Sequence, residues 1–182
     1  LAGNSLLTLA FEILANKNLK ISDNKKILLI KYISNCSGHE GVAGGQYSDL
    51  KFENKRISLK KIKDMQFKKT GRLFSFCCVA PLITVNKNNL INKFNKIGEN
   101  IGLLFQISDD LIDYSGNSKI AGKKTRKDEA KGKATLISLL GYKNTIKYSK
   151  KLKQNIFNEL AKYQNRSKNL RETIEFILSR TN

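Results

Sequence analysis

Hydrophobic residues recur along most of this chain at the three- and four-residue spacing of an α-helix, and no stretch has the alternating pattern of a β-strand. The sequence therefore predicts an all-α protein, and it shows no internal repeat. Ser22 and Ser58 stand where helix N-caps are expected. The expected helices cover residues 1–15, 22–36, 58–66, 73–85, 88–115, 134–140, 142–163 and 170–180.

Two further stretches allow more than one interpretation. Residues 38–50 hold four glycines within eight residues, which favours a loop. Yet Gln46, Asp49 and Leu50 keep helical spacing, and small residues allow a helix to pack closely on its neighbour. The Lys-Thr-Gly at 69–71 interrupts a helical pattern, because Thr and Gly weaken a helix interior. It predicts either a kink that opens backbone groups to a ligand or the end of one helix and the start of the next.

The stretch 105–113 places three carboxylates in an otherwise hydrophobic helical pattern. On a helix, Gln106 and the three aspartates fall within about 100° of one face, and hydrophobic residues occupy nearly all of the rest. Such a helix is expected to be buried, so the crowded carboxylates need cations or protons close by. Oxygen ligands favour Mg²⁺, which also binds substrate phosphates. The stretch is therefore a candidate for holding a phosphate ester through magnesium. The three carboxylates are Asp109, Asp110 and Asp113.

The composition of the chain predicts an anionic partner. The 182 residues include 34 Lys and Arg against 15 Asp and Glu, a formal net charge of +19, which is compatible with nucleic acid, an acidic membrane surface or diphosphate substrates. The three cysteines lie in hydrophobic stretches and suit a reduced, cytoplasmic compartment better than a disulfide framework. No signal peptide and no run of about 18 apolar residues is found, so we expect no stable membrane insertion.

The strongest local basic cluster follows the acidic stretch directly, at residues 117–133. It contains two Gly-Lys pairs, which end in Lys123 and Lys133, but neither completes a phosphate-binding P-loop, because the required first glycine and the final Ser or Thr are missing. A solvated loop is the default interpretation. Beside a magnesium-binding face, the segment could instead close over phosphates as a flexible lid.

Five spaced motifs together resemble the trans-isoprenyl diphosphate synthases, and the bacterial-type farnesyl and geranylgeranyl diphosphate synthases in particular. The resemblance covers nearly the whole chain. It implies an all-helical bundle around a central cavity, usually a homodimer, with two aspartate-rich motifs facing each other across the cavity. The motifs are Leu1-Ala2-Gly3, Gly44-Gly45-Gln46 with Asp49-Leu50, Lys69-Thr70-Gly71 with Leu73, Phe105-Gln106 with Asp109-Asp110 and Asp113, and Gly122-Lys123 with Asp128, Gly132-Lys133 and Thr135.

The resemblance also implies an activity and a role for single residues. It implies a prenyltransferase that condenses isopentenyl diphosphate with an allylic diphosphate, which Mg²⁺ helps to ionise. The residues that match the family's Mg²⁺ ligands are Asp109, Asp110 and Asp113. Those that match its substrate-binding residues are Lys69, Gln106, Lys123 and Lys133. Those that match its catalytic residues are Lys69 and the two polar groups beside the reacting carbon, Thr70 and Gln106.

The chain also departs from the family pattern. The first aspartate-rich motif, and the basic residues that hold isopentenyl diphosphate in the family, would lie before Leu1, which is not a Met. Residues 1–182 are therefore expected to be the C-terminal portion of a single polyprenyl synthase domain, with the N-terminal helices missing and one wall of the cavity open. Asn4 stands where the family has Asp, and Lys68 where histidine is common. With half of the metal cluster, the chain alone is expected to be inactive and its parent protein to be the enzyme.

Two other functions compete with this one. The first is a non-catalytic subunit that binds a partner synthase, although such a subunit has no need for three repelling carboxylates. The second is a basic helical protein that binds nucleic acid, which rests on net charge alone and lacks a recognition motif. We expect no nucleic-acid partner.

Overall fold

A computed structural model describes residues 1–115 and 132–180, and within these ranges the chain is helical without strands. The predicted all-α class is confirmed. The elements are α1 (Ala2–Ala15), α2 (Asp23–Ser37), α3 (Val42–Phe52), α4 (Leu59–Gln66), η1 (Phe67–Gly71), α5 (Arg72–Thr84), η2 (Asn88–Leu90), α6 (Ile91–Ser115), α9 (Leu136–Leu140), α10 (Tyr142–Leu160), η3 (Ala161–Ser167) and α11 (Lys168–Ser179).

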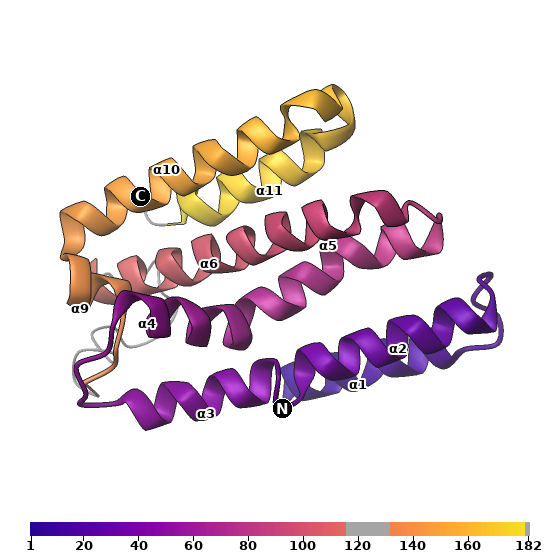
Figure 1. Cartoon of the computed structure of the whole chain (residues 1–182), viewed down its shortest axis with the longest axis horizontal. Helices are drawn as coiled ribbons and strands as arrows, with labels where there is room; N and C mark the ends of the chain where they lie inside the picture. Colours follow the sequence, from indigo (N-terminus) through magenta and orange to yellow (C-terminus); the bar gives the residue numbers. More distant parts are fainter. Residues whose placement is uncertain (116–131, 181–182) are drawn as a thin grey trace.

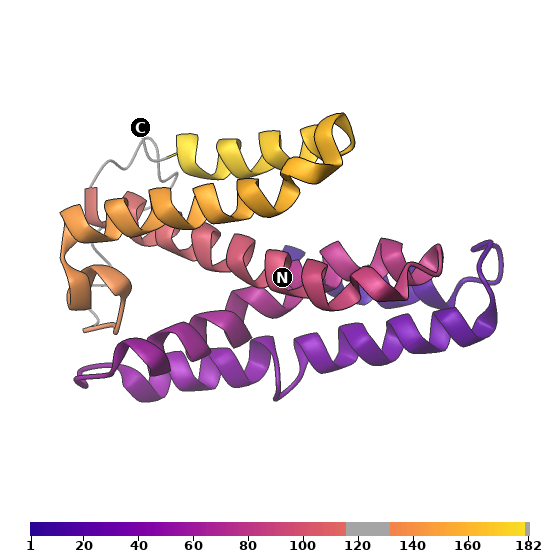
Figure 2. The same cartoon turned by 45° about the horizontal axis from the view of Figure 1, so that its top comes forward.

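The long helix α6 lies in the middle of the bundle (Figure 1). It packs against α5 on one side and against α10 and α11 on the other, while α2 packs on α5 and α1 on α2. Figures 1 and 2 both show α3 following the line of α2, and α4 and η1 leading into α5. The aspartate-rich stretch is thus carried by the central helix.

Hydrophobic burial fixes α6 in this position. Its inward residues Ile97, Ile101 and Leu104 are almost fully buried, and they continue through Ile107 and Leu111 in one core with residues of α4 and α9 to α11. Burying one such aliphatic side chain contributes about 1.5–3 kcal/mol. The helical periodicity of the sequence therefore already identified the face that forms the core.

Two glycines let α6 approach its neighbours more closely than other residues would. A Cβ atom at Gly98 would lie 2.5 Å from the Cα of Ser75, and one at Gly102 would lie 2.6 Å from the Cα of Gly71. These contacts fix the position of α6 along its axis relative to η1 and α5. One turn beyond Gly102, Gln106 consequently faces Thr70, the residue before Gly71.

The hydroxyl of Ser108 fastens α11 to α6. It is fully buried and donates a hydrogen bond to the carbonyl of Ile177 at 2.7 Å. We expect Ser108→Ala to lower the free energy of unfolding by about 1–3 kcal/mol, because the carbonyl loses its donor inside the core. Chemical denaturation should detect this change. Ser34→Ala is the control, since Ser34 is exposed, bonds within its own helix, and should change stability by less than about 0.5 kcal/mol.

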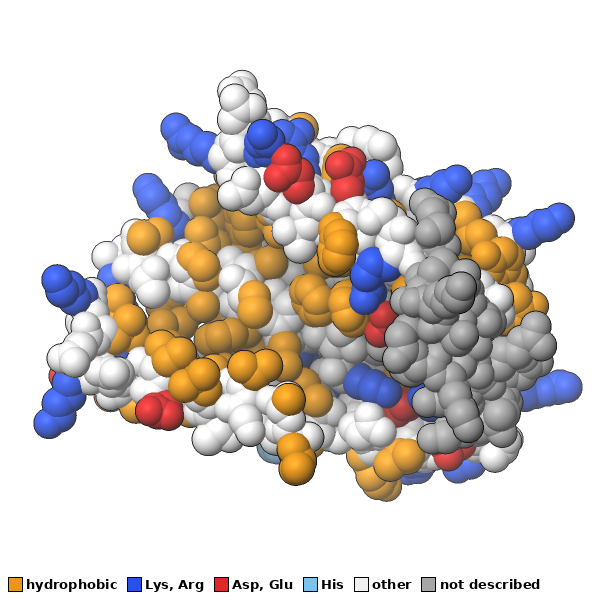
Figure 3. Space-filling model, turned by 180° about the vertical axis from the view of Figure 1, so that it is seen from behind, with side chains coloured by type: hydrophobic (Ala, Val, Ile, Leu, Met, Phe, Trp, Pro, Cys, Tyr) orange, Lys and Arg blue, Asp and Glu red, His pale blue; other side chains and the backbone are white. Residues whose placement is uncertain are grey.

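One face of the molecule is hollowed and largely hydrophobic (Figure 3). Large apolar side chains are also exposed on the first two helices, where α1 buries no residue at all. They are Leu6, Leu9, Ile13, Ile27 and Leu28. Across residues 1–115 and 132–180, no helix has the length and hydrophobicity needed to cross a membrane.

The three cysteines have free thiols in different surroundings. Cys36 is buried, Cys77 is exposed and Cys78 is half-buried. Desolvation by burial, with a smaller contribution from Cys77, raises the pKa of Cys78 to about 11. Cys78 is therefore a protonated, weakly reactive thiol at neutral pH.

Candidate functional site

The three aspartates of α6 have different environments. Asp110 and Asp113 are buried, with 4% and 6% of their surface exposed, whereas the side chain of Asp109 is 35% exposed. Positions on one helix face thus differ in their access to solvent. Residues of α4 and η1 contact one edge of that face, and Arg180, just after α11, contacts the other edge at Asp109.

Two amides hold the carboxylate of Asp110. The Nε2 of Gln106 donates to its Oδ1 at 2.9 Å, and the Nε2 of Gln66 reaches its Oδ2 at 3.4 Å. Gln66 is itself 2% exposed, and its Oε1 has no hydrogen-bond partner. The two amides therefore contribute neutral donors to the position of Asp110, and the Oε1 of Gln66 beside it is a buried acceptor without a donor.

Asp109 faces a cation that lies just beyond the end of another helix. Its Oδ1 lies 3.0 Å from the Nη2 of Arg180, and the guanidinium carbon lies 4.6 Å from the centre of the Phe105 ring. Arg180 follows α11, so this contact joins residues 71 positions apart.

The Lys-Thr-Gly tripeptide forms a π-helical turn, η1, that connects α4 to α5 without a break. The helix continues through the tripeptide with a local distortion, so the alternative in which one helix ends and a new one starts is wrong. A π-turn inserts an extra residue into the helix and is frequent at functional sites. Here it directs Thr70 toward α6, where its Oγ1 donates to the Oε1 of Gln106 at 3.2 Å.

From Val42 on, the glycine-rich stretch is a helix with a tight packing face, so the loop alternative is wrong there, whereas residues 38–41 form a turn. α3 begins at Val42, and a Cβ atom at Gly45 would lie 2.2 Å from the backbone nitrogen of Lys69. One helical turn later, the buried carboxylate of Asp49 lies 2.6 Å from the Nζ of Lys69. The close contact thus places α3 so that Asp49 holds the lysine of η1. The neighbouring Lys68 points instead to the exposed Glu40.

Polar side chains from four separate segments of the chain line one small pocket. Its polar lining includes Asp49, Gln66, Lys69, Gln106, Asp110 and Lys133. The pocket has a volume of about 20 Å³. This is enough for about one water molecule.

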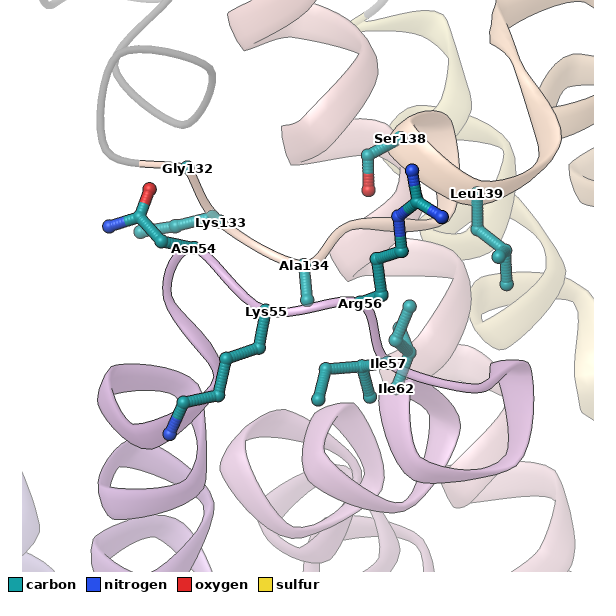
Figure 4. A pocket seen from close by; sticks show the side chains of 10 residues that line it. All are labelled: Asn54, Lys55, Arg56, Ile57, Ile62, Gly132, Lys133, Ala134, Ser138 and Leu139. Carbon is teal, nitrogen blue, oxygen red and sulfur yellow. The ribbon is translucent and has the colours of Figure 1, made fainter.

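Lys133 reaches this pocket from the segment before α9. The preceding residue, Gly132, has φ +60° and accepts a hydrogen bond from the backbone N–H of Asn54 at 2.8 Å, which fastens the segment to the loop after α3. Lys133 also lines a larger neighbouring pocket of about 540 Å³, with Arg56 and Ser138 on its other side (Figure 4). Lys123, the other lysine predicted in this part of the sequence, lies outside the described residues.

The donor atoms suit a hard cation, but they are not assembled as a ready metal site. Carboxylate oxygens are the ligands that Mg²⁺ prefers. In residues 1–115 and 132–180, however, no group of three acidic, histidine or cysteine side chains could hold a metal ion together. Asp109 is paired with Arg180, and Asp110 is bonded to two amides. The residues therefore fit Mg²⁺ in kind, and binding it requires these existing contacts to rearrange.

The sequence did not identify three polar residues of this region as functional. Asp49 belongs to one of the five motifs, but no role was predicted for it. Its position three residues after Gln46, which places both on one helix face, could have indicated a role. Gln66 and Arg180 had no signal, because their partners Asp110 and Asp109 are 44 and 71 positions away.

Comparisons with known proteins agree over nearly the whole chain. The polyprenyl synthetase family model matches residues 1–175. The farnesyl diphosphate synthase of Micrococcus luteus is 34% identical over 181 residues, which are 99% of this chain and 62% of that protein. The farnesyl diphosphate synthase of Escherichia coli is 33% identical over 155 residues, which are 84% of this chain and 52% of that protein.

Solved structures share the fold. The FPP/GFPP synthase from Zymomonas mobilis, in its apo form, is similar with a TM-score of 0.81 and 32% identity, over 97% of this chain and 59% of that chain. The geranyltransferase from Helicobacter pylori, complexed with magnesium and isoprenyl diphosphate, also has a TM-score of 0.81, with 28% identity over 97% of this chain and 58% of that chain. The present chain spans about half to three-fifths of the length of the curated relatives it matches.

Proposed function

Because this chain belongs to the polyprenyl synthetase family, we propose that the whole protein is a prenyltransferase that condenses isopentenyl diphosphate with an allylic diphosphate. The resemblance drawn from the sequence motifs is confirmed at the level of the family. The observation that carries the proposal is the convergence of Lys69, Gln106 and Asp110 on one pocket. A carboxylate suits a metal ion and a lysine suits a diphosphate, and the amide of Gln106 orients the carboxylate of Asp110.

Release of diphosphate from an allylic carbon requires its growing negative charge to be neutralised. Lys69 would supply one positive charge, and Lys133 lines the same pocket. Lys123 is proposed as a third diphosphate-binding lysine by resemblance. The ligands of Mg²⁺ would be Asp109, Asp110 and Asp113, and bound Mg²⁺ would neutralise phosphate oxygens as a Lewis acid.

Thr70 and Gln106 would face the carbon that becomes positively charged. Their side chains are hydrogen-bonded to each other across η1 and α6, so their oxygen dipoles are held in place before any charge forms. The double bond of isopentenyl diphosphate would then attack that carbon, and loss of a proton would complete the step. Hydrophobic walls would exclude water, which otherwise reacts with the cation.

A second copy of the chain is the proposed partner. The family resemblance implies a homodimer. The exposed apolar side chains of α1 and α2 offer a surface that a second copy or the rest of the whole protein would cover. Size-exclusion chromatography with light scattering on the whole protein would measure its mass in solution.

The test of the function uses the whole protein with isopentenyl diphosphate and dimethylallyl or geranyl diphosphate. With Mg²⁺, we expect a longer prenyl diphosphate, identified by mass spectrometry, and with EDTA we expect no product. The 182-residue chain alone should form none under the same conditions. A whole protein that folds, binds DNA in a salt-sensitive way and makes no prenyl product would support nucleic-acid binding instead.

A further inference from the structure

Arg180 makes a defined contact with the acidic face of α6. Its guanidinium donates to Oδ1 of Asp109 at 3.0 Å and lies over the ring of Phe105, with the guanidinium carbon 4.6 Å from the ring centre. Phe105 and Asp109 are one helical turn apart, so a single planar guanidinium contacts both. The two charged side chains are 29% and 35% exposed, which shields the pair partly from solvent.

The end of α11 is anchored, so this contact does not depend on a loose tail. Ser108, next to Asp109, bonds the carbonyl of Ile177, and Ile174 and Ile177 are buried in the main core. The backbone is therefore fixed against α6 at Ile177, which is less than one helical turn before Arg180.

We propose that Arg180 is a positioning residue that occupies Asp109 in the metal-free protein and must be displaced when a divalent cation binds. The inference rests on the proposed function, because it assumes that Asp109 is a Mg²⁺ ligand. The guanidinium of Arg180 lies against Oδ1 of Asp109, so a cation already occupies one of its carboxylate oxygens. A guanidinium and a metal ion at the same carboxylate oxygen compete for it, so each lowers the affinity of the other. Arg180 would then set the Mg²⁺ concentration at which the site fills.

The test measures Mg²⁺ binding directly, without turnover. The whole protein is titrated with MgCl₂ by isothermal calorimetry, and Arg180→Gln is expected to bind Mg²⁺ about three- to tenfold more tightly, since a partly shielded ion pair with a cation–π contact no longer has to be broken. Arg171→Gln is the matched control. Arg171 lies on α11, the helix that Arg180 follows. It donates to the carbonyl of Gln164 at 3.1 Å, and its loss should leave the affinity unchanged.

Two further variants make each outcome decisive. Arg180→Lys keeps the charge but loses the planar contact with Phe105, so it should tighten Mg²⁺ binding by a smaller factor than Arg180→Gln. It also replaces Arg180→Gln if circular dichroism shows that variant to be unfolded. Asp109→Asn should weaken Mg²⁺ binding, which establishes that the titration reports this site.

If Asp109→Asn weakens binding but the Arg180 variants bind Mg²⁺ equally or more weakly than the native protein, the displacement model is overturned while the proposed function stands. If the native protein binds no Mg²⁺ without substrate, the displacement model is overturned, whereas the proposed function is judged separately by product formation with Mg²⁺ and with EDTA.

Discussion

Replacing Asp110 with asparagine is expected to lower the turnover of the whole protein by about 100- to 1,000-fold, as removal of one preorganised electrostatic group does in other enzymes. The substitution keeps the size of the side chain, and its carbonyl oxygen can still accept from Gln106. It removes the negative charge at the place where three carboxylates are proposed to hold Mg²⁺. The rate of prenyl diphosphate formation at saturating substrates and Mg²⁺ measures the effect.

Asp23→Asn is the matched control for Asp110→Asn. Asp23 lies at the start of α2 with a side chain that is 91% exposed, and it contacts Lys26 away from the pocket. Its loss should leave turnover within about twofold. A normal rate for a folded Asp110→Asn protein would remove Asp110 from the mechanism, and thermal unfolding of both variants checks that the fold is retained.

Gly45→Ala is expected to destabilise the protein and to displace the proposed active-site lysine at the same time. The new methyl group would lie 2.2 Å from the backbone nitrogen and 2.5 Å from the Cα of Lys69. Both atoms are backbone, so α3 or η1 must move. Overpacking of this kind costs about 1–3 kcal/mol. At roughly 2–4 °C per kcal/mol for a protein of this size, Tm should fall by about 2–12 °C.

The same movement should reduce activity beyond what the loss of stability explains. A shift of about 1 Å in a positioned group can cost about 100-fold in rate. We therefore expect turnover to fall even at a temperature where Gly45→Ala is fully folded. Gly3→Ala is the control, because no described atom lies within 4 Å of its added Cβ and α1 is helical there. Equal stability of the two variants would show that the contact between α3 and η1 can yield without strain.

Local sequence patterns determined most of the secondary structure. Helical spacing of apolar residues identified the core face of α6, and Ser58 caps α4 as expected, accepting from the N–H of Lys61. The same spacing grouped Gln106 with the three aspartates. These predictions succeed because the contacts concerned lie within one or two turns of the same helix, where spacing along the chain fixes direction in space.

Two features of the secondary structure, the helix at residues 42–52 and the π-turn before α5, depend on contacts between segments that the local sequence pattern does not reveal. The glycines at 44 and 45 were compatible with both a loop and a helix. Packing requires their small size, because a Cβ atom at Gly45 would meet the backbone of Lys69 and one at Gly44 would meet the backbone carbonyl of His39. The Lys-Thr-Gly tripeptide lies in a π-turn that continues directly into α4 on one side and α5 on the other. Each of these helices buries one face, so the irregularity is absorbed within the helix.

The sequence by itself determined the helical class, the buried central helix and the acidic face on it, because each depends on residues close together along the chain. Only the tertiary structure decided that Asp49 holds Lys69, that Gln66 supports Asp110 and that Arg180 pairs with Asp109. These pairs join residues 20 to 71 positions apart. The relative placement of packed helices, which no local spacing encodes, brings such residues together.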